Sequence, residues 1–387
     1  MKKFLAVILM LFALQNFVYA EDVLLENSNN IFEEVTIEEN ATEEVVSGHT
    51  LYEKIMAIQA KEVTDLDTPN FLLDEILIKE FKSGIIENVE LYGSIRSDLD
   101  VDIYDDDTDT NYRFSTIHTG VRGKFRGSKT YYETMFRLNG QHDQPFLRYM
   151  MGNMYIANKS IPHHTVIFGS SRTPTGKEGG MSVHTIPFVA RSQISRNIGN
   201  VRKFGLRVQG SYDLIDYDLG GYSSDTYWQS FFPGGEFTGW VNLKPLGKTD
   251  GKYGKLDIGG GISTGQNDTN YFISGAYVGY EYKKFFADFE WSSANGYNSS
   301  KCITTKHADG FYTTVGYKLT PKLHVLARYD EFRPDKNIPD DKRREYTAGL
   351  NWYIKGQGLK VMLNYVFCQN DKFKDSHRII LGTQILL

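Results

Sequence analysis

The chain has 387 residues, a formal net charge of −5, and 25 tyrosines and 24 phenylalanines against 2 cysteines and 10 prolines. Two cysteines exclude the disulfide framework of a small secreted domain, and an aromatic, proline-poor composition is typical of a chain rich in β-strands. No apolar run beyond the first residues is long enough for a membrane-spanning helix, which excludes a helical membrane protein.

The first residues have the order of a secretory signal peptide. Lys2 and Lys3 precede an apolar run, and the small residue Ala20 precedes Glu21. We therefore expect residues 1–20 to be a signal peptide that is removed after Ala20.

An acidic N-terminal segment is expected over residues 21–85. Residues 21–47 contain nine acidic residues and no Lys or Arg, which predicts a disordered or loosely ordered stretch. Residues 49–62 and 71–82 have apolar residues at helical spacing and predict one or two short helices. A barrel plug, a coiled-coil stalk and a passive spacer are the alternatives for this segment.

From residue 86 onward, apolar and polar residues alternate in segments separated by turn-rich stretches, which indicates β-strands. Sixteen such segments start near residues 86, 111, 130, 147, 164, 202, 214, 237, 254, 271, 284, 309, 322, 343, 358 and 377. An even number suits a closed antiparallel barrel. The sequence therefore predicts an all-β fold, a transmembrane antiparallel β-barrel of about 16 strands over residues 86–387.

The hairpin at residues 346–365 gives the clearest indication of membrane-spanning β-strands. Each of its two segments alternates over about ten residues, a length that crosses a bilayer and exceeds the five or six of an average soluble strand. One face is apolar, and the other is polar with Thr347, Asn351, Lys360 and Asn364. The odd connections, such as 171–200, are long and most even ones are short, as in outer-membrane barrels.

The polar face of each strand should line the lumen, and its basic residues are the candidate site. Residues 113–207 contain fifteen Lys or Arg and only three acidic residues. A low-dielectric wall focuses such a field and attracts anions. The predicted pore-lining and anion-binding residues are Arg122, Lys124, Arg126, Arg137, Arg172, Arg191, Arg196, Lys203 and Arg207. The alternative is that acidic residues of the first strand, such as Asp98 and Asp100, pair with these cations and cancel the field.

Several stretches resemble the phosphate-selective porin O and P family. They are the 346–365 hairpin, STIHTGVRGKFRGSKTYYETMFRLNG, PFVARSQISRNIGNVRKFGLRVQG and ADGFYTTVGYKLT, within residues 86–387. The resemblance implies a sixteen-stranded barrel, usually a homotrimer, that passes anions along a ladder of arginines and lysines, with Arg191 in the third loop as a member. The family's selective members also use a lysine-rich fifth outer loop, whereas residues 264–270 have no Lys or Arg.

The predicted function is therefore a porin in the outer membrane of a Gram-negative-type bacterium. It would allow passive diffusion of small hydrophilic solutes with a preference for anions, phosphate or polyphosphate among them, in contact with outer-membrane lipid. The alternative is a structural or adhesive barrel with a closed lumen, in which the aromatic loop at 226–237 binds a surface.

Other classes are disfavoured by the sequence. The nine His are scattered, and no nucleophile motif or metal-ligand set is present, so we expect no enzyme, metal or cofactor. Nucleic acid is not an expected partner, because the basic residues alternate with lipid-facing apolar ones. Cys302 and Cys368 both fall near outer loop ends and are candidates for one disulfide, the alternative being two unpaired thiols.

Overall fold

Alternating apolar and polar residues favour long strands here, because the two faces of each strand meet different surroundings. The computed structural model describes residues 77–104, 107–138, 150–199, 201–225, 232–298, 303–372 and 374–387, which belong to one unit. Its sixteen wall strands are β2 (Ile86–Ile103), β3 (Thr108–Phe125), β4 (Thr130–Arg137), β5 (Met151–Asn158), β6 (His164–Arg172), β7 (Arg202–Ser211), β8 (Ile215–Ser223), β9 (Gly235–Leu243), β10 (Lys255–Asn267), β11 (Thr269–Tyr282), β12 (Phe285–Asn298), β13 (Ile303–Lys318), β14 (Leu323–Arg333), β15 (Arg343–Lys355), β16 (Leu359–Asn370) and β17 (Ser376–Leu386).

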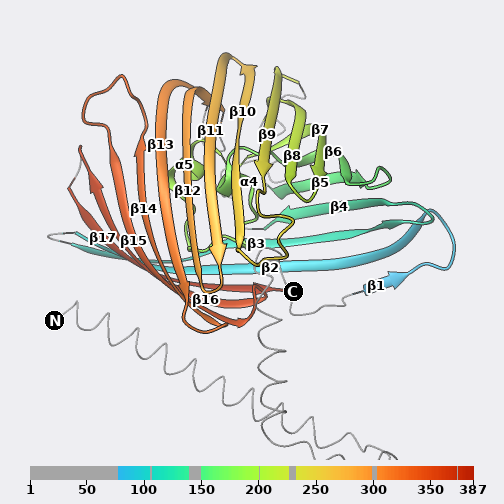
Figure 1. Cartoon of the computed structure of the whole chain (residues 1–387), viewed down its shortest axis with the longest axis horizontal. Coiled ribbons are helices and arrows are strands. Elements are labelled where there is room, and N and C mark those ends of the chain that lie inside the picture. Colours follow the sequence, from blue (N-terminus) through green and yellow to red (C-terminus); the bar gives the residue numbers. More distant parts are fainter. Residues whose placement is uncertain are drawn as a thin grey trace, which may run out of the picture. The chain divides into compact units, whose positions relative to one another are not determined.

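These strands form a closed antiparallel ring (Figure 1). Each strand pairs with the next along the chain, and β2 closes the ring by pairing with β17, from Ile103 opposite His377 to Ser94 opposite Leu386. The predicted sixteen-stranded barrel is therefore confirmed. None of the helices among the described residues has the length and apolar content needed to cross a membrane.

The inward and outward faces follow the predicted alternation. In the β15–β16 hairpin, Tyr346 and Leu350 are 43 and 38 % exposed on the outer surface, whereas Asn351 and Lys360 are fully buried inside. The outer face is thus apolar and suited to lipid, and the polar residues line the interior.

A short strand precedes the ring where a helix was expected. β1 (Leu77–Glu80) pairs with β2 near Asn88 and Glu90, so the helix predicted over residues 71–82 is wrong at this end. The reason lies in β2, whose pairing with β17 stops at Ser94 and leaves an open edge for residues 88–90. Filling that edge outweighs a short helical pattern. The helix predicted over residues 49–62 lies outside the described residues.

Aromatic rings on the inner wall lie flat against glycines of neighbouring strands. A methyl group on Gly259 would stand 2.2 Å from the Tyr277 ring, and one on Gly261 would stand 2.7 Å from Trp240. The two rings stack with their planes 13° apart. Glycine is needed at these positions because the rings occupy the space of a side chain.

Candidate functional site: the constriction

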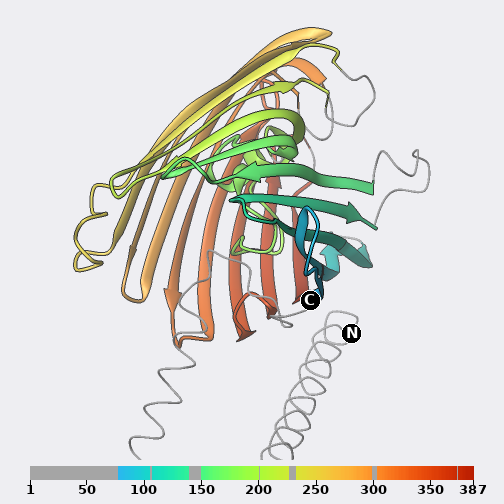
Figure 2. The same ribbon diagram turned by 90° about the vertical axis from the view of Figure 1, so that its right-hand side faces the viewer.

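The third outer connection, residues 173–201, folds into the barrel (Figure 2). We call this segment L3; it contains two short helices, α4 (Lys177–Gly180) and α5 (Gln193–Asn197). Its hydrogen bonds reach inward-facing side chains of β2, β12 and β14–β17. L3 therefore narrows the lumen from one side of the wall.

The start of α4 is held by a carboxylate of the barrel wall. Gly176, the residue before the helix, has φ 78° and no side chain to cap the free N–H groups. Glu290 of β12 accepts hydrogen bonds from the backbone N–H of Lys177 at 2.7 Å and of Glu178 at 3.1 Å, and from the Tyr312 hydroxyl at 2.9 Å. A Cβ at position 176 would stand 2.3 Å from the Glu290 carboxylate, so glycine is required.

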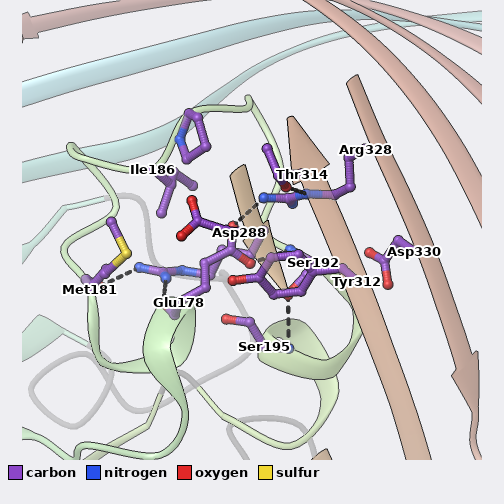
Figure 3. Close-up of polar contacts among 12 residues, drawn as sticks. Glu178, Met181, Ile186, Ser192, Ser195, Asp288, Tyr312, Thr314, Arg328 and Asp330 are labelled. Atoms are coloured by element: carbon purple, nitrogen blue, oxygen red, sulfur yellow. Dashed lines mark hydrogen bonds and ion pairs between the residues drawn. The ribbon is translucent and has the colours of Figure 1, made fainter. Parts of the chain in front are cut away.

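Glu178 is the central anchor of L3 (Figure 3). Its carboxylate accepts from Arg328 of β14 at 2.7 Å and from the Ser192 N–H at 2.6 Å, while Arg191 donates to the carbonyl oxygens of Glu178 and Met181. Burial alone would raise the pKa of Glu178, but the charges of Arg328 and Arg191 and the Ser192 hydrogen bonds outweigh burial, so the pKa is lowered. The buried carboxylate thus stays charged and compensated.

The second helix is anchored by two further wall carboxylates. Asp330 of β14 accepts from the Gln193 N–H at 2.7 Å, and Arg196 pairs with Glu345 of β15 at 2.7 Å. Burial is the largest single influence on Arg196 and would lower its pKa. The charge and the hydrogen bonds of Glu345 act in the opposite direction, and the pKa is raised. The carboxylates on this side of the lumen are therefore engaged with cations and N–H groups of L3.

Apolar side chains add a third kind of contact. Ile194 and Ile198 of L3 are 2 % exposed and pack in one cluster with Tyr312, Phe332, Ile273, Ala294, Tyr297 and Ala308 of the wall. Val189 packs against Met362, Val366 and Ile380. The Arg328 guanidinium lies 4.4 Å from the centre of the Phe188 ring. Burying these groups stabilises the docked loop in addition to its polar contacts.

The middle of L3 is held through its backbone carbonyl groups. Arg96 donates to Val183 at 2.8 Å, and Lys360 donates to the His184 carbonyl at 2.8 Å. The His184 ring packs edge-on against His118, with 5.9 Å between ring centres. Burial, followed by the positive charge of Arg96, holds the pKa of His184 well below its usual range, so the ring is neutral at neutral pH.

Guanidinium groups of the opposite wall gather near Arg191 of L3. The charges that act most strongly on Arg172, at the end of β6, are those of Arg202, Arg191, Arg137 and Arg207. Arg137 donates to the Met151 carbonyl at 3.1 Å and Arg202 to the Asn153 amide at 2.8 Å. These two acceptors are neutral groups, and Asn153 in turn donates to Glu133. We call Arg137, Arg172, Arg191 and Arg202 the guanidinium cluster.

Other predicted site residues are held in ion pairs. Arg122 lies 3.0 Å from Glu90, and Lys124 lies 3.4 Å from Glu87. The remaining pairs are Lys203 with Glu236, Arg207 with Asp218 and Arg196 with Glu345. Their charges are therefore offset locally, in two cases by acids of the first wall strand, whereas Asp98 and Asp100 of that strand pair with Arg113.

Arg126 lies in the β3–β4 turn, away from the other basic residues of the prediction. It donates to the Gly84 carbonyl at 3.0 Å and to the Phe81 carbonyl, so it ties the β1–β2 connection to the end of the barrel.

Two functional residues were missed by sequence reasoning. Arg202 is the first residue of β7, where alternation assigns it to the lipid side, yet its side chain reaches Asn153. Arg328 is buried and binds Glu178 from 150 positions away, a partnership without a local signal. The only sign of Arg328 in the sequence is its place in the alternation of β14, which directs its side chain into the lumen.

The cysteine and histidine candidates are placed as follows. Cys368 in β16 is half-buried and forms no disulfide with a described residue. Cys302 lies outside the described residues, so a disulfide between these two cysteines stays a prediction. His163 precedes β6 and His184 belongs to L3. Within the described ranges, no group of three His, Cys, Asp or Glu could hold a metal ion.

Comparison with known proteins agrees with this architecture. Residues 258–384 match the model of the family described as phosphate-selective porin O and P, as the resemblance predicted. The barrel is similar to Salmonella typhi OmpF, solved in complex with daunomycin (11 % identity, TM-score 0.60, covering 78 % of this chain and 98 % of that one). Its fold is that of an outer-membrane porin.

Two further solved structures share the porin's fold. They are an anion-selective porin from Comamonas acidovorans (13 % identity, TM-score 0.58, covering 77 and 99 % of the two chains) and the outer-membrane channel DcaP of Acinetobacter baumannii (12 % identity, TM-score 0.53, covering 80 and 99 %). At these identities the similarity concerns the fold alone. No curated protein matches the porin.

Replacing Arg328 by Ala should release L3 from the wall. The change leaves the Glu178 carboxylate buried without its partner, at a cost of about 3–5 kcal/mol. Single-channel recordings should show large current fluctuations in place of a steady level. The matched control is Lys342→Ala, which removes a partly exposed pair with Glu331 worth about 0–1 kcal/mol and should leave the current steady.

The double variant Glu178→Gln/Arg328→Met removes both charges and should recover much of the steady current, because neither partner is then left unpaired. A steady wild-type level in Arg328→Ala alone would contradict the role of this pair.

Acid should loosen L3. The pKa of His184 is lower in the folded chain than in the unfolded chain, so the unfolded chain binds more protons and stability falls as pH falls below about 6.5. Glu178 contributes in the same direction, but only near and below about pH 4.3. Current noise should therefore rise between about pH 7.5 and 5.5, and His184→Asn should remove most of that rise. An equal rise in this variant would refute the assignment to His184.

Proposed function

We propose that this porin is a passive diffusion channel that prefers small anions. The observation that carries the proposal is the guanidinium cluster at the level of L3, facing a wall whose carboxylates are occupied. Glu290, Asp330 and Glu345 are bound by N–H groups and cations of L3, whereas Arg137 and Arg202 donate to neutral acceptors. These contacts support a positive field at the constriction.

A constriction of this kind selects by charge at short range. Screening by salt is weak where ions pass within a few ångströms of a fixed charge and the wall has a low dielectric constant. Anions gain attraction there and cations lose it. Arg191 belongs to L3 itself, where it also compensates Glu178, so the docked loop adds a guanidinium group at this level in addition to narrowing the lumen.

Phosphate is one candidate solute, since the matched family is described as phosphate-selective. The β10–β11 connection is the single residue Asp268 and supplies no lysine to the lumen. We therefore propose small inorganic and organic anions as the solute class, with phosphate tested as a blocker. The porin would act as a channel and not as an enzyme.

The adhesive alternative is not favoured by any described feature. Residues 226–231 of the aromatic loop on which it depends lie outside the described residues.

We also propose that the porin is a homotrimer in the outer membrane. One of the similar solved structures, OmpT of Vibrio cholerae, is described as a trimer form (12 % identity, TM-score 0.54). Native mass spectrometry of the refolded porin in non-ionic detergent should give a mass of three chains. A monomer under conditions that preserve the barrel would contradict this part of the proposal.

The charge preference should depend on the guanidinium cluster. In a planar bilayer with a KCl gradient of about tenfold, the wild-type reversal potential should have the sign of an anion-preferring pore. Arg137→Gln/Arg202→Gln should move it most of the way to zero, because two fixed charges are lost while polar contacts are kept. Arg126→Gln is the control, since this residue lies in a turn, and should leave the potential unchanged.

A cation-side reversal in the wild type would mean that acids such as Asp98 and Asp100 dominate the field. Absence of conductance by a folded barrel would favour the closed, structural barrel.

A further inference from the structure

The two rims of the barrel carry opposite charge. The seven connections between β3 and β16 on the side away from L3 contain nine basic and two acidic residues. On the side where L3 begins, the seven connections other than L3 contain six basic and eleven acidic residues. Long connections lie outside and short turns lie in the periplasm in barrels of this class, so the basic rim is periplasmic.

Most lysines of the periplasmic turns have no acidic partner among the described residues. Among the described residues, seven lysines of these turns make no ion pair: Lys129, Lys159, Lys248, Lys252, Lys283, Lys284 and Lys322. We call this set the lysine rim. Lysines of the outer rim behave differently, since Lys342 lies 3.0 Å from Glu331 and Lys372 lies 2.7 Å from Asp341.

The lysine rim has a lysine even at a turn position where the backbone conformation favours glycine or asparagine. Lys283 and Lys284 form the two-residue turn between β11 and β12, and Lys283 has φ 53°. Glycine or asparagine adopts this conformation at lower cost, and two-residue hairpin turns prefer them. A charged residue that the turn does not require points to a role beyond the turn.

The lysine rim lies just beyond a belt of lipid-facing aromatic residues. Tyr280, Phe285 and Tyr317, near the periplasmic ends of their strands, are 37, 44 and 46 % exposed on the outer surface. Such belts mark the boundary between hydrocarbon and headgroups. Lys283 lies 5.0 Å from the centre of the Tyr282 ring, which places its ammonium group next to the belt.

The longest periplasmic turn presents its lysines from an ordered scaffold. Residues 244–254 form successive tight turns, with hydrogen bonds from Gly247 to Lys244, from Lys252 to Thr249 and from Gly254 to Gly251. The Tyr280 hydroxyl donates to the Tyr253 carbonyl at 2.9 Å and fixes the turn to the belt. Beside it lies a groove of about 670 Å³, lined by Lys283 and the paired Lys244 and Lys255 together with the acidic Asp213 and Glu281.

We propose that the lysine rim docks anionic phospholipid headgroups of the periplasmic leaflet. The position at the belt favours a headgroup over a free anion, because the acyl chains would lie against the apolar wall while the phosphate meets the lysines. Lysines near an anionic membrane surface contribute additively to binding, and several together give a useful affinity. The inference concerns the rim and is independent of what the pore conducts.

The test is native mass spectrometry of the refolded full chain in non-ionic detergent, titrated with short-chain phosphatidylglycerol and, separately, phosphatidylcholine. The wild type should bind phosphatidylglycerol preferentially. The variant Lys248→Gln/Lys252→Gln/Lys283→Gly/Lys284→Gln should bind it about tenfold more weakly or worse, since four ammonium groups are lost. Raising the salt concentration should weaken wild-type binding, because the contacts are electrostatic.

The matched control is the quadruple variant Lys336→Gln/Lys342→Gln/Lys372→Gln/Lys374→Gln on the outer rim, which should bind like the wild type. Lys283→Gly alone separates binding from folding, since it relaxes the turn and removes one charge. It should keep or improve resistance to urea while weakening lipid binding. Three results would overturn the proposal. They are equal binding of the two lipids by the wild type, an equal loss of phosphatidylglycerol binding in the outer-rim control, and displacement of the lipid by millimolar inorganic phosphate.

Discussion

A chain that crosses a bilayer has no water with which to satisfy its backbone N–H and C=O groups, and the ring meets that constraint by pairing its first strand, β2, with its last, β17. Closure forces every strand to present one face to lipid and the other to the interior. The polar face of each strand is thereby turned to one concave surface. The charges that give this porin its field are inside because the backbone must be paired, whatever solute it carries.

The polar interior in turn decides how L3 can be held. A loop that enters such a lumen meets carboxylates, amides and cations, so its anchors are ion pairs and hydrogen bonds, with apolar contacts in addition. Glu178 with Arg328 and Arg196 with Glu345 are the charged anchors. These anchors also distribute charge: one wall uses its acidic groups to hold the loop, and Arg137 and Arg202 of the facing wall donate to neutral acceptors.

The fold could be predicted from the sequence because side-chain direction in a strand depends on parity alone. That rule placed Lys203, Arg207 and Arg137 on the inner wall without any knowledge of distant residues. It fails where local pattern is not the deciding influence. Arg202 starts its strand and turns inward, β1 forms because β2 has an open edge, and the anchors of L3 join residues more than a hundred positions apart. Which predicted cations are offset by carboxylates likewise depends on neighbours across strands, as for Arg122 and Glu90.

The glycines under the inner aromatic rings have a consequence for sieving by size. Because the Tyr277 and Trp240 rings lie flat only while positions 259 and 261 lack side chains, the bore of the tube depends on residues that contribute no atoms to its lining. A single methyl group there would tilt a ring toward the axis and narrow the passage without altering any charge. The width of the passage and the charge of its wall can therefore change independently in this barrel.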